Sequence, residues 1–285
     1  MADDSKVANR ELRIGVDYFD KVANRYMGQL QSEYHRHRLG VIESLLHGLD
    51  LKGKTCVDFG CGDGIFCETL AERGAFVIGI DPSEIMIEKA LQQYGQDKRM
   101  RFILGGSSDF MNLRETDVFL VTALNVLAYQ TAEEEKQFYE AGYKALQDGG
   151  WLILTHSNEL FDMYTFNKYT VRFFKNHFGG GSPEYDISSL LRHPEKPERG
   201  VLSIRENPLN YKHKLLRHGF EEVQQEFMML HKVPPLMQAG FDCDDLNSRE
   251  FPDTLNWRDE DAWKLMFQCS VFASKSRKRT PPPSR

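Results

Sequence analysis

Three glycines and two aspartates are spaced in a way that predicts a binding site for a nucleoside. Gly60, Gly62 and Gly64 follow a short apolar run, and Asp58 stands two residues before the first of them. Glycines at such a loop let the backbone turn tightly and approach a ligand closely. Asp81 ends the next apolar run, where its carboxylate can accept hydrogen bonds from both hydroxyls of a ribose. A helix-start turn, Asp-Pro-Ser, is the alternative interpretation of Asp81.

The acid before the glycines indicates which nucleoside. The dinucleotide fingerprint is GxGxxG, whereas the spacing here is GxGxG and position 65 is Ile. A pyrophosphate would be repelled by the Asp58 carboxylate, but a ligand with an ammonium group would not. S-adenosylmethionine carries an ammonium group and a sulfonium and has no phosphate. The loop therefore favours S-adenosylmethionine as the cofactor over a nicotinamide dinucleotide.

Several segments resemble a known family. In order along the chain, VDFGCGDG, VIGIDPSEIMIEKA and LQDGGWLIL are similar to motifs of the class I S-adenosylmethionine-dependent methyltransferases, closely over residues 53–156. The resemblance implies a seven-stranded sheet with an antiparallel last strand. It also implies cofactor contacts from Asp58, Gly60, Gly62, Gly64 and Asp81. The segment YFDKVANRY resembles the helix that precedes the core in small-molecule members, so Tyr18 and Tyr26 are expected at the cofactor.

The sequence departs from this family where the adenine would bind. Many members carry an aspartate after the third strand, but the segment here reads LGGSSD. Backbone groups, Ser107 or Asp109 are expected to replace that aspartate. Leu124 and Asn125, which follow the fourth strand, are expected to border the methionine part of the cofactor.

Two histidines are candidates for the chemical step. Methyl transfer to a hydroxyl requires alignment of the reacting groups and removal of a proton. His156 follows the fifth predicted strand and His231 the sixth, so both are placed at the ligand edge of the sheet. Histidine suits proton removal near neutral pH. We expect His156, and after it His231 or Tyr129, to act as the base; a capping or surface role is the alternative.

Alternating apolar and helical patterns must position these residues. The fold class predicted is α/β, a doubly wound, Rossmann-like, seven-stranded and mostly parallel sheet. Strands are predicted at 54–59, 76–80, 100–104, 118–122, 151–155 and 221–230, helices at 10–48, 65–73, 83–94, 133–146 and 211–218, and a final apolar segment at 263–273. Residues 1–50 should pack over the cofactor site, and 51–275 should form the methyltransferase domain. Substrate-covering insertions are expected at about 157–206 and 232–262, and a disordered tail at 276–285.

Composition limits the partners. The formal net charge is −6 and the pI about 5.9, which disfavours a nucleic-acid partner. The five cysteines have no metal-ligand spacing, so we expect no metal and a reducing, cytoplasmic location. No apolar run approaches the length of roughly 18 residues that a membrane span needs. We expect methylation of an oxygen, or less readily a nitrogen, of a small molecule or saccharide. A protein or RNA methyltransferase, a non-catalytic cofactor-binding protein and a nicotinamide oxidoreductase remain alternatives.

Overall fold

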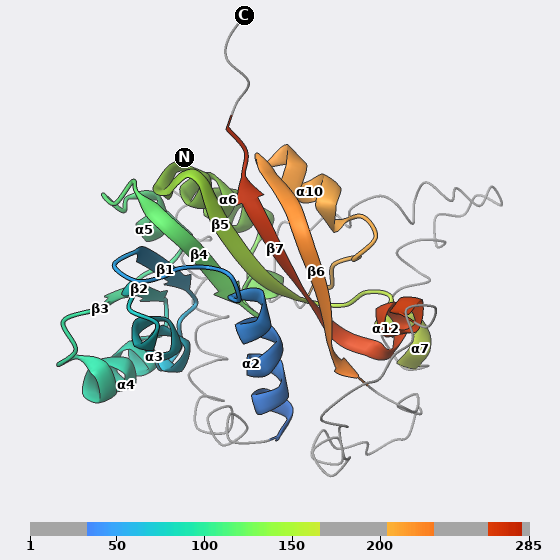
Figure 1. Cartoon of the computed structure of the whole chain (residues 1–285), viewed down its shortest axis with the longest axis horizontal. Helices are drawn as coiled ribbons and strands as arrows, with labels where there is room; N and C mark the ends of the chain where they lie inside the picture. The colour runs from blue at the N-terminus through green and yellow to red at the C-terminus, as the bar shows by residue number, and fades with distance from the viewer. Residues whose placement is uncertain (1–32, 166–203, 231–261, 281–285) are drawn as a thin grey trace, which may run out of the picture.

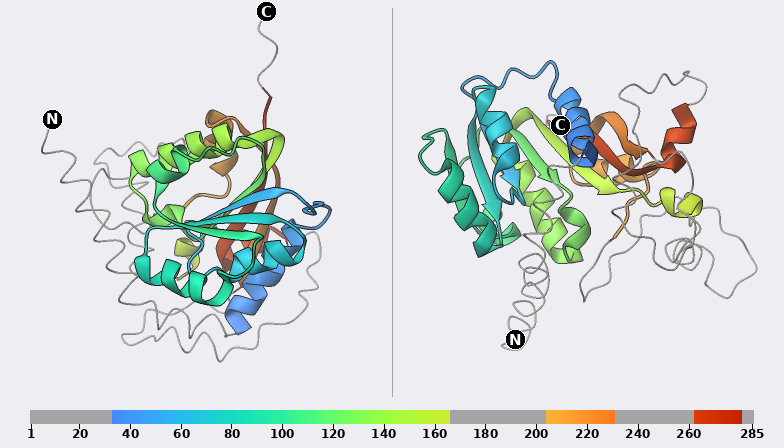
Figure 2. Two further views of the ribbon diagram at one scale, coloured as in Figure 1. Left: turned by 90° about the vertical axis from the view of Figure 1, so that its left-hand side faces the viewer. Right: turned by 90° about the horizontal axis from the view of Figure 1, so that it is seen from below.

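The computed structural model describes residues 33–165, 204–230 and 262–280, which form one sheet with helices on both faces (Figures 1 and 2). Seven strands lie in the order β3-β2-β1-β4-β5-β7-β6. Their bounds are β1 Thr55–Phe59, β2 Phe76–Asp81, β3 Met100–Leu104, β4 Val118–Leu124, β5 Leu146–Ser157, β6 Phe220–Leu230 and β7 Cys269–Lys278. Strands β1 to β5 pair in parallel, and β7 is antiparallel to both β5 and β6. The predicted fold class is confirmed.

Among the described residues, the helices predicted to start at 65, 83, 133 and 211 begin within one residue of those positions, whereas the short helices at 107–111, 127–129, 161–165 and 262–268 were not predicted. The helices are α2 Glu33–Leu45, α3 Ile65–Glu72, α4 Glu84–Tyr94, α5 Ser107–Met111, the 3₁₀ turn η1 Leu127–Tyr129, α6 Ala132–Ala145, α7 Phe161–Thr165, α10 Tyr211–Arg217 and α12 Ala262–Gln268. Ser83 caps α4 by accepting a hydrogen bond from the Met86 N–H, as expected for an Asp-Pro-Ser turn. Thr131 and Glu134 form a capping box at the start of α6.

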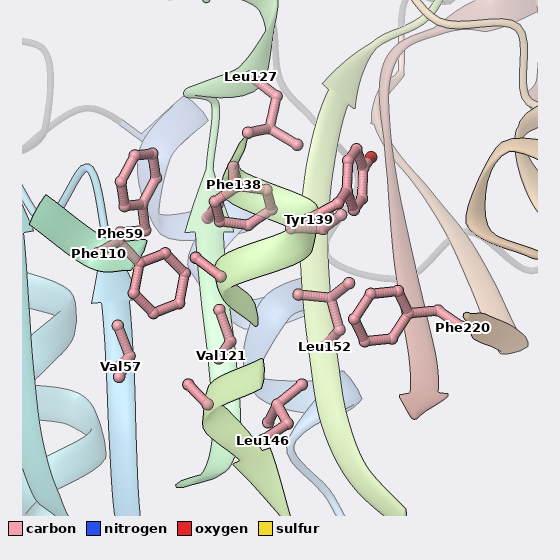
Figure 3. Packing of buried hydrophobic residues seen from close by; sticks show 14 of the residues in the cluster. Val57, Phe59, Phe110, Val121, Leu127, Phe138, Tyr139, Leu146, Leu152 and Phe220 are labelled. Atoms are coloured by element: carbon pink, nitrogen blue, oxygen red, sulfur yellow. The ribbon is translucent and has the colours of Figure 1, made fainter. Parts of the chain in front are cut away.

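Each face of the sheet has its own apolar core. Aromatic rings fill the face under α5, α6 and α10, where Phe59 packs 5.0 Å from Phe138 between ring centroids and Tyr139 lies near Phe220 (Figure 3). The other face buries smaller side chains under α2 and α3, among them Ile42. Because side chains on both faces of the sheet are buried, the register between neighbouring strands is strongly specified. The carboxyl ends of β1 to β5 therefore lie along one edge of the sheet.

Several boundaries differ from the predictions, among them both ends of β5, which runs to Ser157 rather than residue 155. Strand β5 begins at Leu146 rather than residue 151, because Leu146 pairs with Val118 before a bulge. Residues 276–278 belong to β7 and not to a disordered tail. Their basic side chains have partners: the Lys278 Nζ donates to the Leu146 carbonyl at 2.6 Å, and Arg277 donates to the Gly149 carbonyl at 3.1 Å. The apolar segment 263–273 is divided between α12 and β7.

Several predicted features lie outside the described residues. They are Tyr18, Tyr26, His231 and most of both insertions. Of the predicted N-terminal helix, the structure describes only the part that forms α2. Helix α2 packs against β6 through the core that contains Ile42 and Leu45. Among the described residues, no helix is long and apolar enough to cross a membrane. Within the same residues, no cluster of three or more His, Cys, Asp or Glu side chains is arranged to hold a metal.

Candidate functional site

The glycine loop between β1 and α3 has a backbone that only glycine adopts readily. The φ angles of Gly60, Gly62 and Gly64 are 73°, 56° and 86°, all in the left-handed region. A Cβ on Gly60 would lie 2.2 Å from the Cγ2 of Val126, so the loop after β4 fills that side. A Cβ on Gly62 would meet nothing within 4 Å. The loop is therefore packed at Gly60 and open at Gly62, which is where a ligand can approach the backbone.

Asp81 holds the glycine loop in place. Its Oδ2 accepts a hydrogen bond from the Gly62 N–H, and its Oδ1 accepts one from the Ser83 N–H, both at 2.9 Å. Only 9% of the residue is exposed. The carboxylate is largely buried because the glycine loop folds back over it. Asp81 connects the end of β2 to both the glycine loop and the start of α4.

Asp58 is buried below the loop. Its Oδ1 accepts a hydrogen bond from the Thr122 hydroxyl at 2.6 Å, and its Oδ2 accepts one from the Cys67 thiol at 3.6 Å. Burial raises the pKa of Asp58 to about 7, although these two hydrogen bonds act in the opposite direction. A cation bound nearby would favour the ionised form of this carboxyl. When such a cation is bound, the Asp58 carboxyl can supply a buried negative charge under the loop.

The next two strands end in polar contacts that shape the same edge. Ser107 is buried, and its hydroxyl accepts a hydrogen bond from the Gln130 side-chain amide at 2.9 Å. The Asp109 carboxylate accepts a hydrogen bond from the Gly106 N–H and so caps α5. Strand β4 ends at Leu124. The next residue, Asn125, has a φ of 64°, and its N–H donates to the Thr155 hydroxyl at 2.8 Å. Left-handed residues other than glycine gather at functional sites.

His156 is inside the core rather than at the ligand edge. Its exposed fraction is 2%, and its ring centroid lies 4.3 Å from that of Tyr211 and 5.2 Å from that of Phe272. A general base must come within hydrogen-bond distance of the acceptor hydroxyl. The side chain instead lies on the face of the sheet that α10 covers. This geometry gives His156 a packing role and does not support its predicted role as the base.

A polar cluster that the sequence patterns did not single out follows β5. Residues 157–159 lie beside residue 206: Glu206 N–H donates to the Ser157 carbonyl, and Glu159 N–H donates to the Glu206 carbonyl, both at 2.9 Å. Arg205 and Asp162 form an ion pair with a separation of 3.0 Å. The only sequence signal is the density of polar residues at the two ends of the first insertion, SNELFD and RENP.

A model of the methyltransferase domain matches residues 56–150, which include β1 to β4, the glycine loop, Asp58 and Asp81. Over these residues the chain has a methyltransferase domain, which supports the class I S-adenosylmethionine-dependent methyltransferase family that its sequence resembles. Among its curated relatives is a ubiquinone biosynthesis O-methyltransferase from Hydrogenovibrio crunogenus, 26% identical over 51% of this chain and 61% of that protein. Another, of the same name, from Nitrosomonas europaea is 26% identical over 60% of this chain and 75% of that protein. The chain thus spans well under the full length of the relatives it matches.

Solved structures share the fold of this chain. The magnesium protoporphyrin IX methyltransferase from Synechocystis, with bound S-adenosylhomocysteine, aligns with a TM-score of 0.57 at 17% identity, over 95% of this chain and all of that one (100%). An S-adenosylmethionine-dependent methyltransferase from Mesorhizobium loti aligns with a TM-score of 0.51 at 18% identity, over 84% of this chain and 96% of that one. At these identities the likeness shows the fold.

Proposed function

We propose that this methyltransferase transfers the methyl group of S-adenosylmethionine to an oxygen of a small molecule. The observation that carries the proposal is the glycine loop, open at Gly62, beside the Asp81 carboxylate. The open backbone of the loop at Gly62 would lie against the methionine part of the cofactor. Asp81 would accept hydrogen bonds from the ribose hydroxyls through its remaining lone pairs.

The other cofactor contacts that we propose surround this pair. Ser107 lies at the start of α5, where the adenine would bind, and Leu124 ends the strand beside the methionine part. Asp58 supplies negative charge beneath a cofactor that carries two cationic groups. Tyr18 and Tyr26 are proposed to complete the site from the N-terminal segment.

An oxygen acceptor is favoured by the relatives' names. Both relatives described above are O-methyltransferases of ubiquinone biosynthesis, so hydroxyl methylation is the first activity to test. The comparisons do not support the saccharide that the sequence suggested as an acceptor. Nitrogen methylation stays the second chemical possibility. We propose that the protein has no nucleic-acid partner, since its net charge is −6. We also propose a cytoplasmic location, since the four described cysteines are free thiols.

The chain's own residues would act mainly by alignment. Methyl transfer from a sulfonium is an in-line displacement: the new carbon–oxygen bond forms as the carbon–sulfur bond breaks, and a neutral thioether leaves without protonation. The acceptor hydroxyl must lose its proton to a base as it attacks. Of the predicted bases, His231 lies outside the described residues, and Tyr129 lies in η1, directly after β4. His231 and then Tyr129 are the bases that we propose to test.

The experiment is a methyl-transfer assay with S-adenosylmethionine and separate panels of phenols, alcohols, amines and sugars. Formation of S-adenosylhomocysteine, detected by mass spectrometry and corrected for a blank without acceptor, measures turnover. We expect methylation of a hydroxyl compound. Binding of S-adenosylmethionine without turnover on any panel would favour the non-catalytic alternative. Methylation of protein or RNA alone would overturn the small-molecule assignment.

A further inference from the structure

A buried lysine connects the chain segments that follow β4 and β5. Lys214, on α10, places its Nζ 2.5 Å from an oxygen of Glu135 and 2.7 Å from an oxygen of Glu206. All three residues are buried, with exposed fractions of 7%, 5% and 3%. Glu135 lies in the first turn of α6, which follows η1, and Glu206 lies at the return of the chain after the first insertion.

The Glu206 side chain fixes a backbone segment between two loops of the ligand edge. Residue 204 donates its N–H to the Ala128 carbonyl in η1 at 3.0 Å. Two residues later, Glu206 exchanges backbone hydrogen bonds with residues 157 and 159 beyond β5. The segment 204–206 therefore joins the loop after β4 to the loop after β5, and Lys214 holds it from the core side.

The charges of this cluster make the lysine essential to the arrangement. Burial alone would lower the pKa of Lys214, but Glu206 and Glu135 outweigh it, and the pKa is raised from its ordinary value. Lys214 therefore stays charged between two carboxylates. Without the ammonium, two buried carboxylates would face each other with no compensating cation between them.

The neighbouring hydroxyls complete the packing around the lysine. Tyr139 and Tyr211 share a hydrogen bond of 2.6 Å between their hydroxyl oxygens, and the Lys214 Nζ lies 5.9 Å from the centre of the Tyr139 ring. Both tyrosines are fully or almost fully buried. The cluster thus has a rigid floor, so movement on loss of the lysine would be expected in segment 204–206.

We propose that Lys214 is a positioning residue for the acceptor half of the active site. The inference rests on the proposed function: the cofactor occupies the ends of β1 to β3 and borders Leu124 at the end of β4, so the loops that follow β4 and β5 are left for the acceptor. Lys214 acts through the backbone of 204–206 and touches neither ligand. Its loss should misplace the acceptor side and leave the cofactor side intact.

The test compares Lys214→Met with Lys214→Arg and with the matched control Lys136→Met. Lys136 also forms an ion pair with a glutamate, Glu140, but on the exposed face of α6. For Lys214→Met we expect kcat/KM for the hydroxyl acceptor to fall by about 10- to 100-fold, the effect of a small misplacement of reacting groups. The KM for S-adenosylmethionine should stay near its wild-type value, the arginine variant should recover most of the loss, and the control should be unchanged.

Hydrogen exchange gives a readout that needs no acceptor. In Lys214→Met, peptides that contain residues 157–162 and 204–207 should lose amide protection, while those of the glycine loop should keep it. If the methionine variant does not fold, Glu206→Gln and Glu135→Gln replace it. Both remove one charge from the cluster, but only Glu206 belongs to the segment, so Glu206→Gln should have the larger effect on the acceptor.

Two results would overturn the proposal. One is unchanged protection of 157–162 and 204–207 in a folded Lys214→Met protein. The other is an equal loss of affinity for cofactor and acceptor, which would show general destabilisation. Failure of the proposed function would look different: the wild-type protein itself would bind no S-adenosylmethionine or would methylate no small molecule.

Discussion

Asp81 provides the sharpest test of how the cofactor site is built, because one carboxylate has both a structural and a ligand-binding role. Replacing it with alanine removes the acceptors of the Gly62 and Ser83 N–H groups. Each hydrogen bond to a charged group contributes about 1.5–3 kcal/mol, and two that share a carboxylate do not add fully, so we expect a loss of roughly 2–4 kcal/mol in unfolding free energy. The melting temperature should fall by roughly 5–15 °C.

The affinity for the cofactor should fall as well. Asp81→Ala removes the proposed ribose contacts and releases Gly62 from its hydrogen bond. We expect a loss of about 1–3 kcal/mol in binding, which raises the Kd for S-adenosylmethionine between about 5-fold and 150-fold. Asp81→Asn should lie between wild type and alanine, because an amide keeps only one accepting oxygen.

Calorimetry for the Kd and scanning calorimetry for the melting temperature measure the two effects separately. Asp97→Ala is the matched control, since the Asp97 carboxylate also accepts a hydrogen bond from the N–H two residues later, at 2.9 Å, but on an exposed loop before β3. The control should bind the cofactor like wild type and lose little stability. An unchanged Kd in Asp81→Ala, or a melting temperature no lower than that of the control, would refute the reasoning.

Three further perturbations follow from the same geometry. Gly60→Ala should abolish measurable cofactor binding, because its Cβ would meet Val126 at 2.2 Å. Gly62→Ala has open space around its Cβ and should cost only about 1–2 kcal/mol of stability for its left-handed backbone. An equal loss of unfolding free energy in the two variants would contradict this. The raised pKa of Asp58, about 7 against an ordinary 3.8, means that the folded protein keeps a proton that the unfolded chain releases. The stability that this group contributes is therefore complete below about pH 4 and is lost as the pH rises to about 7. In thermal denaturation without cofactor, the wild-type protein should lose stability over this pH window relative to Asp58→Asn. Parallel plots of melting temperature against pH for the two proteins would argue against it. His156→Phe keeps an aromatic ring in the core and should retain turnover within about 3-fold, whereas a loss of about 10²–10⁴ would identify His156 as the base after all.

Local signals predicted the scaffold of the site. The GxGxG spacing, the aspartate that ends β2 and the Ser83 cap all depend on residues within a few positions, and the structure places them as expected. The alternation of strands and helices likewise predicted the order of elements, because each depends on its own hydrophobic pattern.

Partners distant in the sequence could not be predicted in this way. Thr122 lies 64 positions from Asp58, and their hydrogen bond exists only because β1 and β4 pair in one register. The basic end of β7 resembled a solvated tail, since nothing in its own sequence shows that Trp151 and Tyr143 lie beneath Arg277 and Lys278.

The sequence also did not predict which way the His156 side chain points. His156 was placed just past the end of its strand, where side chains face a ligand. In the structure β5 continues through Ser157, and pairing with Phe272 of β7 turns the His156 ring toward the core. An error of two residues in the predicted strand end therefore placed His156 beyond the sheet instead of within it.

Isothermal titration of the wild-type protein with S-adenosylmethionine, S-adenosylhomocysteine and NADH tests the central claim most directly. The open backbone at Gly62, the carboxylate of Asp81 and the buried carboxyl of Asp58, which a bound cation would ionise, predict that the first two ligands bind and that NADH does not. A largely pre-formed site should bind them with Kd values in the micromolar range, about −8 kcal/mol at 1 μM. Binding of NADH with no response to either sulfur compound would contradict the account.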